Sequence, residues 1–154
     1  EKKIDEIIGK GEAAGRKLKE NFLKRTPALK RLREDVAAAV KKRGYLIGID
    51  GRRLHIRSEH SALNTLLQSA GALLVKQATV NLYRELTRRG YKWGKDWAMV
   101  AHIHDEVQLQ VREELVEEVS EVAVWAFQQA GRDFNWRCPL DGEARIGNNW
   151  SETH

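Results

Sequence analysis

The sequence predicts an α+β fold in which helices pack around a small antiparallel sheet. Three observations lead to this prediction. Long segments repeat their apolar residues at helical spacing, shorter segments are extended and apolar or alternating, and the links between neighbouring strands are too short for a crossover helix. The chain has 154 residues, 42% of them apolar and 32% charged, which is typical of one ordinary folded domain rather than a disordered segment.

The first two expected elements are helices. Apolar residues gather on one side of residues 2–24, although three glycines weaken the middle of this helix. Thr26 is a suitable N-cap, and Pro27 is favoured at the first position of a second helix that runs to about Arg43. Gly44 is expected to end the second helix, because glycine readily adopts the left-handed conformation found there.

A hairpin and the longest helix follow. Residues 45–57 hold two extended runs around Asp50-Gly51, which is a strong hairpin signal. The longest helix is expected over residues 60–89, with Ser58 as its N-cap and Gly90 at its end. Its apolar stripe consists of Leu66, Ala70, Leu74, Ala78, Leu82 and Leu86.

A polar row lies on another side of the longest helix. His60, Asn64 and Gln68 are each four residues apart, so they share one face. Taken alone, such a row is most simply a solvated helix face.

The last third of the chain predicts a second hairpin and a helix. Residues 97–103 are expected to form a buried strand and residues 107–111 a half-buried one. A helix over residues 113–130 follows, ended by Gly131, and residues 144–146 are expected to form a short last strand. The expected inward residues of that helix are Leu115, Val119, Val122, Ala123 and Ala126, and the expected solvent-facing ones are Glu117, Glu118 and Glu121.

Charge is unevenly distributed. Residues 1–60 carry 17 Lys/Arg and 9 Asp/Glu, a net +8, whereas residues 61–154 carry 10 and 13, a net −3. The basic first part favours a polyanionic partner such as phosphates, with solvated basic helices as the alternative.

Other features bound the class of protein. No apolar run approaches the ~20 residues of a membrane helix, and no signal segment opens the chain. A single cysteine, Cys138, excludes a disulfide framework and favours an intracellular setting. Cys138 and the five tryptophans are expected to be packing residues. Residue 1 is Glu rather than Met, which indicates processing or excision from a longer chain.

The densest cluster of functional groups lies between the last two strands. His102, His104, Asp105 and Glu106 fall at an expected hairpin tip. Three interpretations are open: a solvated polar turn, a transition-metal site using the two histidines and Glu106, and a carboxylate site in which Asp105 binds Mg²⁺ for phosphoryl transfer.

Several motifs resemble one known family in the same order along the chain. Residues 101–107, with their core His-Asp-Glu, resemble the strand–turn–strand motif of family A, DNA polymerase I-like DNA polymerases. Residues 57–72 resemble the long helix that precedes this motif. Their sequence is most similar to that of the branch used by short-tailed phages. Residues 50–53 match the preceding hairpin, and Asn149-Trp150 and His154 resemble the phage C-terminus.

The resemblance implies a catalytic role for the hairpin tip. It implies that Asp105 binds catalytic Mg²⁺ in the palm, that Glu106 supports the metal and primer end, and that His104 touches the primer terminus. The same resemblance implies that residues 1–44 belong to the fingers and residues 45–154 to the palm. The residues that it implies contact DNA are His60, Asn64 and Gln68 in the minor groove, with Arg52, Arg53 and Arg57 on phosphates.

The resemblance also implies that the catalytic machinery is incomplete. A second metal-binding Asp and a nucleotide-gripping helix with Arg, Lys and Tyr are not found in the sequence. The chain is therefore expected to be part of a DNA-directed DNA polymerase that is inactive alone. Its expected partners are primer–template DNA, dNTP and the rest of the polymerase, without a membrane and in the host-cell cytoplasm. The alternative is a non-catalytic duplex-DNA-binding module.

Overall fold

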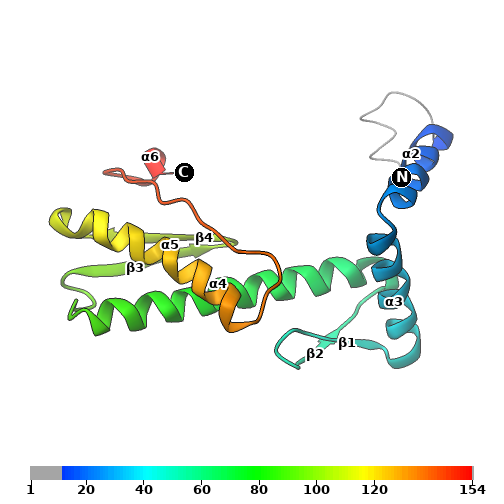
Figure 1. Ribbon diagram of the computed structural model, residues 1–154, viewed down its shortest axis with the longest axis horizontal. Helices are drawn as coiled ribbons and strands as arrows, with labels where there is room; N and C mark the ends of the chain where they lie inside the picture. The colour runs from blue at the N-terminus through cyan, green and yellow to red at the C-terminus, as the bar shows by residue number, and fades with distance from the viewer. Residues whose placement is uncertain (1–11, 154) are drawn as a thin grey trace. The chain divides into compact units, whose positions relative to one another are not determined.

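The computed structural model describes residues 12–153, and the chain forms two compact units, Glu1–Leu66 and Leu67–His154 (Figure 1). Each unit combines helices with one two-stranded antiparallel sheet, so the α+β prediction is confirmed with two separate sheets. Within the described range, every helix is too short or too polar to cross a membrane.

Two helices open the described part of the first unit. Helix α2 spans Glu12–Arg25, and residues 2–11 of the predicted first helix lie outside the described residues. Helix α3 spans Pro27–Arg43 and ends, as predicted, at Gly44, whose φ of 76° is left-handed. Thr26 does not cap α3 with its side chain. Its hydroxyl donates instead to the Phe22 carbonyl at 2.8 Å, since a hydroxyl can satisfy a carbonyl one turn back.

The first hairpin follows α3 directly. Strands β1 (Tyr45–Ile47) and β2 (Arg53–His55) pair antiparallel through a five-residue link, residues 48–52. Gly51 has a φ of 82°, which explains the glycine after Asp50. The buried core of the first unit consists of Val36, Leu46 and Ala62, with Ala39, Val40, Leu54, Ile56, Leu63 and Leu66 packed against it.

The longest helix has the predicted limits. A 3₁₀ turn, η1 (Glu59–Ser61), leads into α4 (Ala62–Arg88), and the Ser58 hydroxyl accepts from the Ser61 amide at 3.3 Å. Gly90 ends the helix with a φ of 91° in a Schellman arrangement, in which the amide of residue 91 donates to the carbonyl of residue 86. The predicted apolar stripe from Ala70 onward is buried.

The second hairpin carries the functional cluster. Strands β3 (Trp97–Ile103) and β4 (Glu106–Val111) pair antiparallel, with an irregularity at Val100. The prediction that β3 is buried throughout is wrong: only Trp97 is buried, and Val100 is 62% exposed. Apart from an isolated bridge between Trp93 and Trp97, β3 pairs with β4 in the described residues, so most of its other edge has no strand neighbour.

The helix after this hairpin extends further than predicted. It begins with a 3₁₀ turn, η2 (Glu113–Leu115), and α5 (Val116–Asp133) continues past Gly131. Gly131 is not a stop, because it is buried and an added Cβ would lie 3.0 Å from the Leu140 Cγ. Asn135, with a φ of 52°, ends the helix in a Schellman arrangement, since asparagine tolerates the left-handed conformation.

A single core joins α4, the second hairpin and α5. It consists of Leu82, Leu86, Trp97, Val119, Val122 and Ala126. The predicted inward face of α5 is confirmed by these contacts, because Leu115 and Ala123 also pack against this cluster.

Three further predictions in this unit are wrong, and a fourth holds only in part. Cys138 is exposed. Of the five tryptophans only Trp97 is buried, although Trp93 packs edge-on against it with 4.7 Å between the ring centres. Residues 144–146 form no strand, because they pair with no other described backbone. The expected irregular tail contains a four-residue helix, α6 (Trp150–Thr153). The errors about exposure and strand pairing share one cause, because both depend on neighbours that are distant in the sequence.

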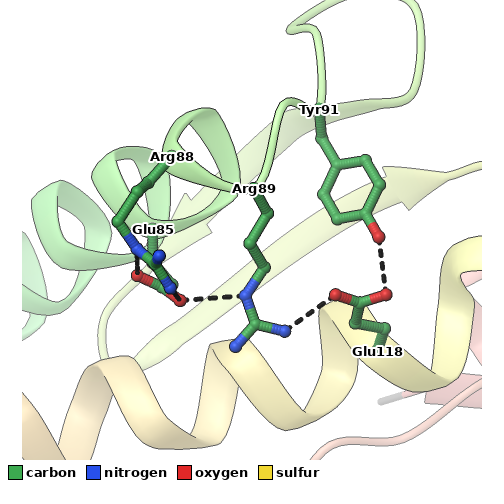
Figure 2. Close-up of polar contacts among 5 residues, drawn as sticks. All are labelled: Glu85, Arg88, Arg89, Tyr91 and Glu118. Atoms are coloured by element: carbon green, nitrogen blue, oxygen red, sulfur yellow. Dashed lines mark hydrogen bonds and ion pairs between the residues drawn. The ribbon is translucent and has the colours of Figure 1, made fainter.

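Charged side chains link the end of α4 to α5, as Figure 2 shows. Glu85 accepts from Arg88 at 2.7 Å and from Arg89 at 2.9 Å, and Arg89 also donates to Glu118 at 2.7 Å. The Tyr91 hydroxyl donates to Glu118 at 2.5 Å. Glu118 therefore does not simply face water as predicted. The hydrogen bond from Tyr91, followed by that from Arg89, lowers the pKa of Glu118.

The Glu85 carboxylate makes stability depend on pH. Hydrogen bonds from Arg88 and Arg89 lower its pKa from 4.5 to about 2, so its contribution is present above pH 4.5 and is lost as the pH falls toward 2. We expect Glu85→Gln to lower the free energy of unfolding at neutral pH, because it removes the charge that the two arginines bind. The expected loss is only about 1 kcal/mol, because solvent screens the exposed arginines. Urea denaturation at a series of pH values measures this, with the exposed Glu121→Gln as control. A difference that persists unchanged at low pH contradicts the assignment.

Candidate active site

The candidate site is built on the tight turn between β3 and β4. Ile103 pairs with Glu106, so the link is the two residues His104 and Asp105. Two-residue hairpin links need a positive φ, and His104 adopts a φ of 54°. A non-glycine residue in this conformation is uncommon, and such residues cluster at functional sites.

The turn exposes one carboxylate and holds the other in place. Asp105 is exposed, and within the described part of the chain no hydrogen bond or ion pair engages its side chain. Glu106 is half-buried as the first residue of β4, and its Oε1 accepts from the Gln108 Nε2. Strand residues two apart share a face, which brings these two side chains together. The two neighbouring acids are therefore held differently. Asp105 is accessible to a ligand from solvent, whereas Glu106 is oriented by Gln108.

The short helix α6 contacts the Gln108 side chain, which also holds Glu106. The Thr153 hydroxyl donates to the Gln108 Oε1 at 3.3 Å, so α6 is tied to β4 next to Glu106. The sequence prediction missed both Gln108 and Thr153. The period-two alternation of β4 was the available signal for Gln108, whereas nothing local marks Thr153, which is 45 residues away.

A cavity of about 770 Å³ lies beside the two acids. It is lined by residues of α4, β4, α5 and the segment 140–147. Its walls are apolar toward α5, where Val119, Ala123 and Phe127 lie, and polar toward Asp105 and Glu106. The hairpin tip therefore presents its carboxylates at the edge of a hollow rather than on a flat surface.

The oxygen donors suit a hard cation but are too few for a complete site. Carboxylates are the ligands that Mg²⁺ prefers, and Asp105 is free to act as one. No group of three or more His, Cys, Asp or Glu side chains in residues 12–153 is placed to hold a metal ion. The transition-metal interpretation with His102, His104 and Glu106 is therefore not supported, because the turn at His104 breaks the strand alternation that would align the histidines.

The other predicted residues are exposed as a contact surface requires. His60 lies in η1, Asn64 and Gln68 lie one turn apart on α4, and all three are exposed. Arg53 in β2 and Arg57 after it are exposed as well. The residues up to position 64 belong to the first compact unit, while Gln68 and the hairpin tip belong to the second.

Comparison with known proteins places the chain in a defined family. The sequence pattern of the family described as DNA polymerase family A matches residues 1–152. The chain is 42% identical to the DNA-directed DNA polymerase of Enterobacteria phage T3 and 40% identical to that of Escherichia phage T7, over its whole length in both cases. It covers 24% of each of these relatives, so it spans about a quarter of their length.

The fold is similar to that of a solved polymerase domain. The POL domain of Pol1 from M. smegmatis, in complex with DNA primer-template and dNTP, matches with a TM-score of 0.73. The match covers 89% of this chain and 24% of that one at 21% identity. At this identity the likeness concerns the fold of the chain. The chain belongs to DNA polymerase family A, as its motifs predicted.

Proposed function

We propose that this chain is the C-terminal portion of a DNA-directed DNA polymerase and contributes one part of its catalytic site. The observation that carries the proposal is the exposed Asp105 in a two-residue hairpin turn of a family A chain. In this proposal residues 1–44 belong to the fingers and residues 45–154 to the palm. The site of action that it implies is the cytoplasm of the phage's host cell.

The hairpin residues take distinct roles in the proposal. Asp105 binds a catalytic Mg²⁺ together with a second aspartate from the rest of the polymerase. When bound, Mg²⁺ would activate the primer 3′-hydroxyl and stabilise the leaving pyrophosphate. Glu106, oriented by Gln108, supports the metal and primer end, and His104 contacts the primer terminus. The hard oxygen ligands and the exposure of Asp105 support this assignment.

The DNA contacts in the proposal match the chemistry of the exposed side chains. His60, Asn64 and Gln68 can donate to the purine N3 and pyrimidine O2 acceptors, which the minor groove offers at every base pair. These contacts would hold duplex DNA without reading its sequence. Arg53 and Arg57 would neutralise phosphates. Incoming dNTP and primer–template DNA are the substrates of the complete enzyme.

The isolated chain is expected to show no Mg²⁺-dependent primer extension, because the described residues supply too few carboxylates for a two-metal site. Incubating purified chain with primer–template, dNTP and Mg²⁺ and resolving the products on a denaturing gel measures this. The Asp105→Asn chain, expressed and purified in the same way, serves as the control for contaminating polymerase. Extension that copurifies with the chain and is absent from the control contradicts the prediction.

The net charge of +8 in residues 1–60 also suits a non-catalytic duplex-DNA-binding module. The two proposals differ in what they require of Asp105. Only the polymerase needs its carboxylate.

A further inference from the structure

The hairpin β1–β2 has one face in the core and one face in solvent. Leu46 is buried and Leu54 packs beside it, so this side of the hairpin covers the first unit's core. Tyr45 lies opposite His55, and Ile47 lies opposite Arg53. Because strand neighbours alternate, these four side chains share the outward face.

Two arginines gather on one aromatic ring of this face. The Arg53 Cζ lies 4.9 Å from the centre of the Tyr45 ring, and the Arg43 Cζ lies 5.6 Å from it. Both distances fall within cation–π range. Two like charges repel each other, so their meeting at one ring concentrates positive charge that the aromatic ring only partly offsets.

No acid in the hairpin offsets that charge. Residues 43–57 contain four arginines and one acid, Asp50. The Asp50 carboxylate is already engaged by Arg52 at 2.5 Å. Among the described contacts, Arg43 and Arg53 have no carboxylate partner. The end of α3 favours a cation at Arg43 through the helix dipole, but this effect does not extend to Arg53 in β2.

An arginine stacked on a ring remains able to bind an anion. Stacking uses the flat face of the guanidinium and leaves its five N–H donors at the edge. Those donors match the oxygens of a phosphate. A side chain that is already held in place also loses less conformational entropy on binding.

We infer that the outward face of β1–β2 binds the phosphate backbone of DNA through Arg43 and Arg53, with Tyr45 as the residue that positions both guanidinium groups. The positive charge of the two arginines favours an anionic ligand. The identification of this ligand as DNA rests on the proposed function. This inference adds Arg43 and Tyr45 to the DNA surface and gives Arg53 a physical reason for its orientation.

Fluorescence anisotropy with a labelled primer–template duplex tests the inference on the full 154-residue chain. Affinity is measured over a series of KCl concentrations for the wild type, Arg43→Gln, Arg53→Gln and the double variant. Each substitution is expected to weaken binding about tenfold near ~50 mM salt and to reduce the salt slope of the affinity by about 1. Tyr45→Leu is expected to weaken binding as well, whereas Tyr45→Phe keeps the ring and restores wild-type affinity.

Arg31→Gln is the matched control, because Arg31 is exposed and pairs with Asp35 at 3.9 Å. A double variant with the same salt slope as this control overturns the inference, as does a wild-type chain that fails to bind at low salt. Inorganic phosphate at constant ionic strength distinguishes the ligand source. If wild type binds inorganic phosphate more tightly than the double variant does, while both bind DNA with the same salt slope, the site binds free phosphate and the DNA inference fails.

The outcome is separate from that of the proposed catalytic role. Unchanged salt slopes refute DNA binding by the outward face of β1–β2 and have no bearing on the proposed role of Asp105. Changed salt slopes, in a polymerase that does not need Asp105, refute the catalytic role and leave this surface standing.

Discussion

Replacing Asp105 by asparagine in a complete polymerase that contains this chain is expected to lower kcat for primer extension by about a thousandfold. Asparagine keeps the size of the side chain and the hydrogen-bonding capacity of the turn, but it removes the negative charge that a hard cation needs. Stabilisation of the transition state by a bound metal is worth several kcal/mol, and about 4 kcal/mol corresponds to this factor. Single-nucleotide incorporation measured by rapid quench gives kcat and KM separately.

Asp35→Asn is the control for this experiment, because it makes the same chemical change at an exposed helical position of α3. It is expected to keep wild-type kcat. Affinity for primer–template should change little in the Asp105 variant, since removing a negative charge does not weaken contacts to phosphates. Near-normal extension by the Asp105 variant would refute the proposed metal role and favour the non-catalytic DNA-binding module.

Leu86→Ala is expected to cause the largest loss of stability, about 3 kcal/mol. Leu86 is 0% exposed and packs with Val119 and Val122 in the core that joins α4, β3 and α5. Truncation removes buried apolar area and leaves a cavity that the surrounding side chains fill only in part. Urea denaturation followed by circular dichroism measures the free energy of unfolding.

Leu67→Ala makes the same change on the same helix at a position that is 55% exposed. Its expected effect is within about 0.5 kcal/mol, which is typical of surface substitutions. Similar losses for the two variants would mean that the second unit does not depend on this core.

Elements with strong local signals were predictable. The limits of α3 and α4 follow from Pro27, Gly44 and Gly90, whose backbone preferences act over one turn of helix. Both hairpins were found because their links are short and their flanking runs are extended. The predictions that failed involve partners far along the chain. Gly131 has the sequence signature of a helix end, but its role is to admit the Leu140 side chain.

In the candidate site, too, local features were predictable and contacts between distant residues were not. Asp105 and Glu106 were predicted from the motif and lie together in the turn region. The tie from Glu106 through Gln108 to Thr153 was not predicted, because it depends on how the tail returns to β4. Likewise, the sequence places Tyr45 two residues after Arg43, but only the strand register brings Arg53 to the same ring.

By itself, the sequence determined the fold class, the order of most elements, the family and the acid-tipped turn, because each of these depends on patterns within a few consecutive residues. Only the tertiary structure decided which acids are engaged, which aromatic residues are exposed and which arginines share a ring. The physical reason is that burial and charge pairing are set by neighbours in space. Glu118 and Tyr91, 27 residues apart, become partners only when α5 packs against the end of α4.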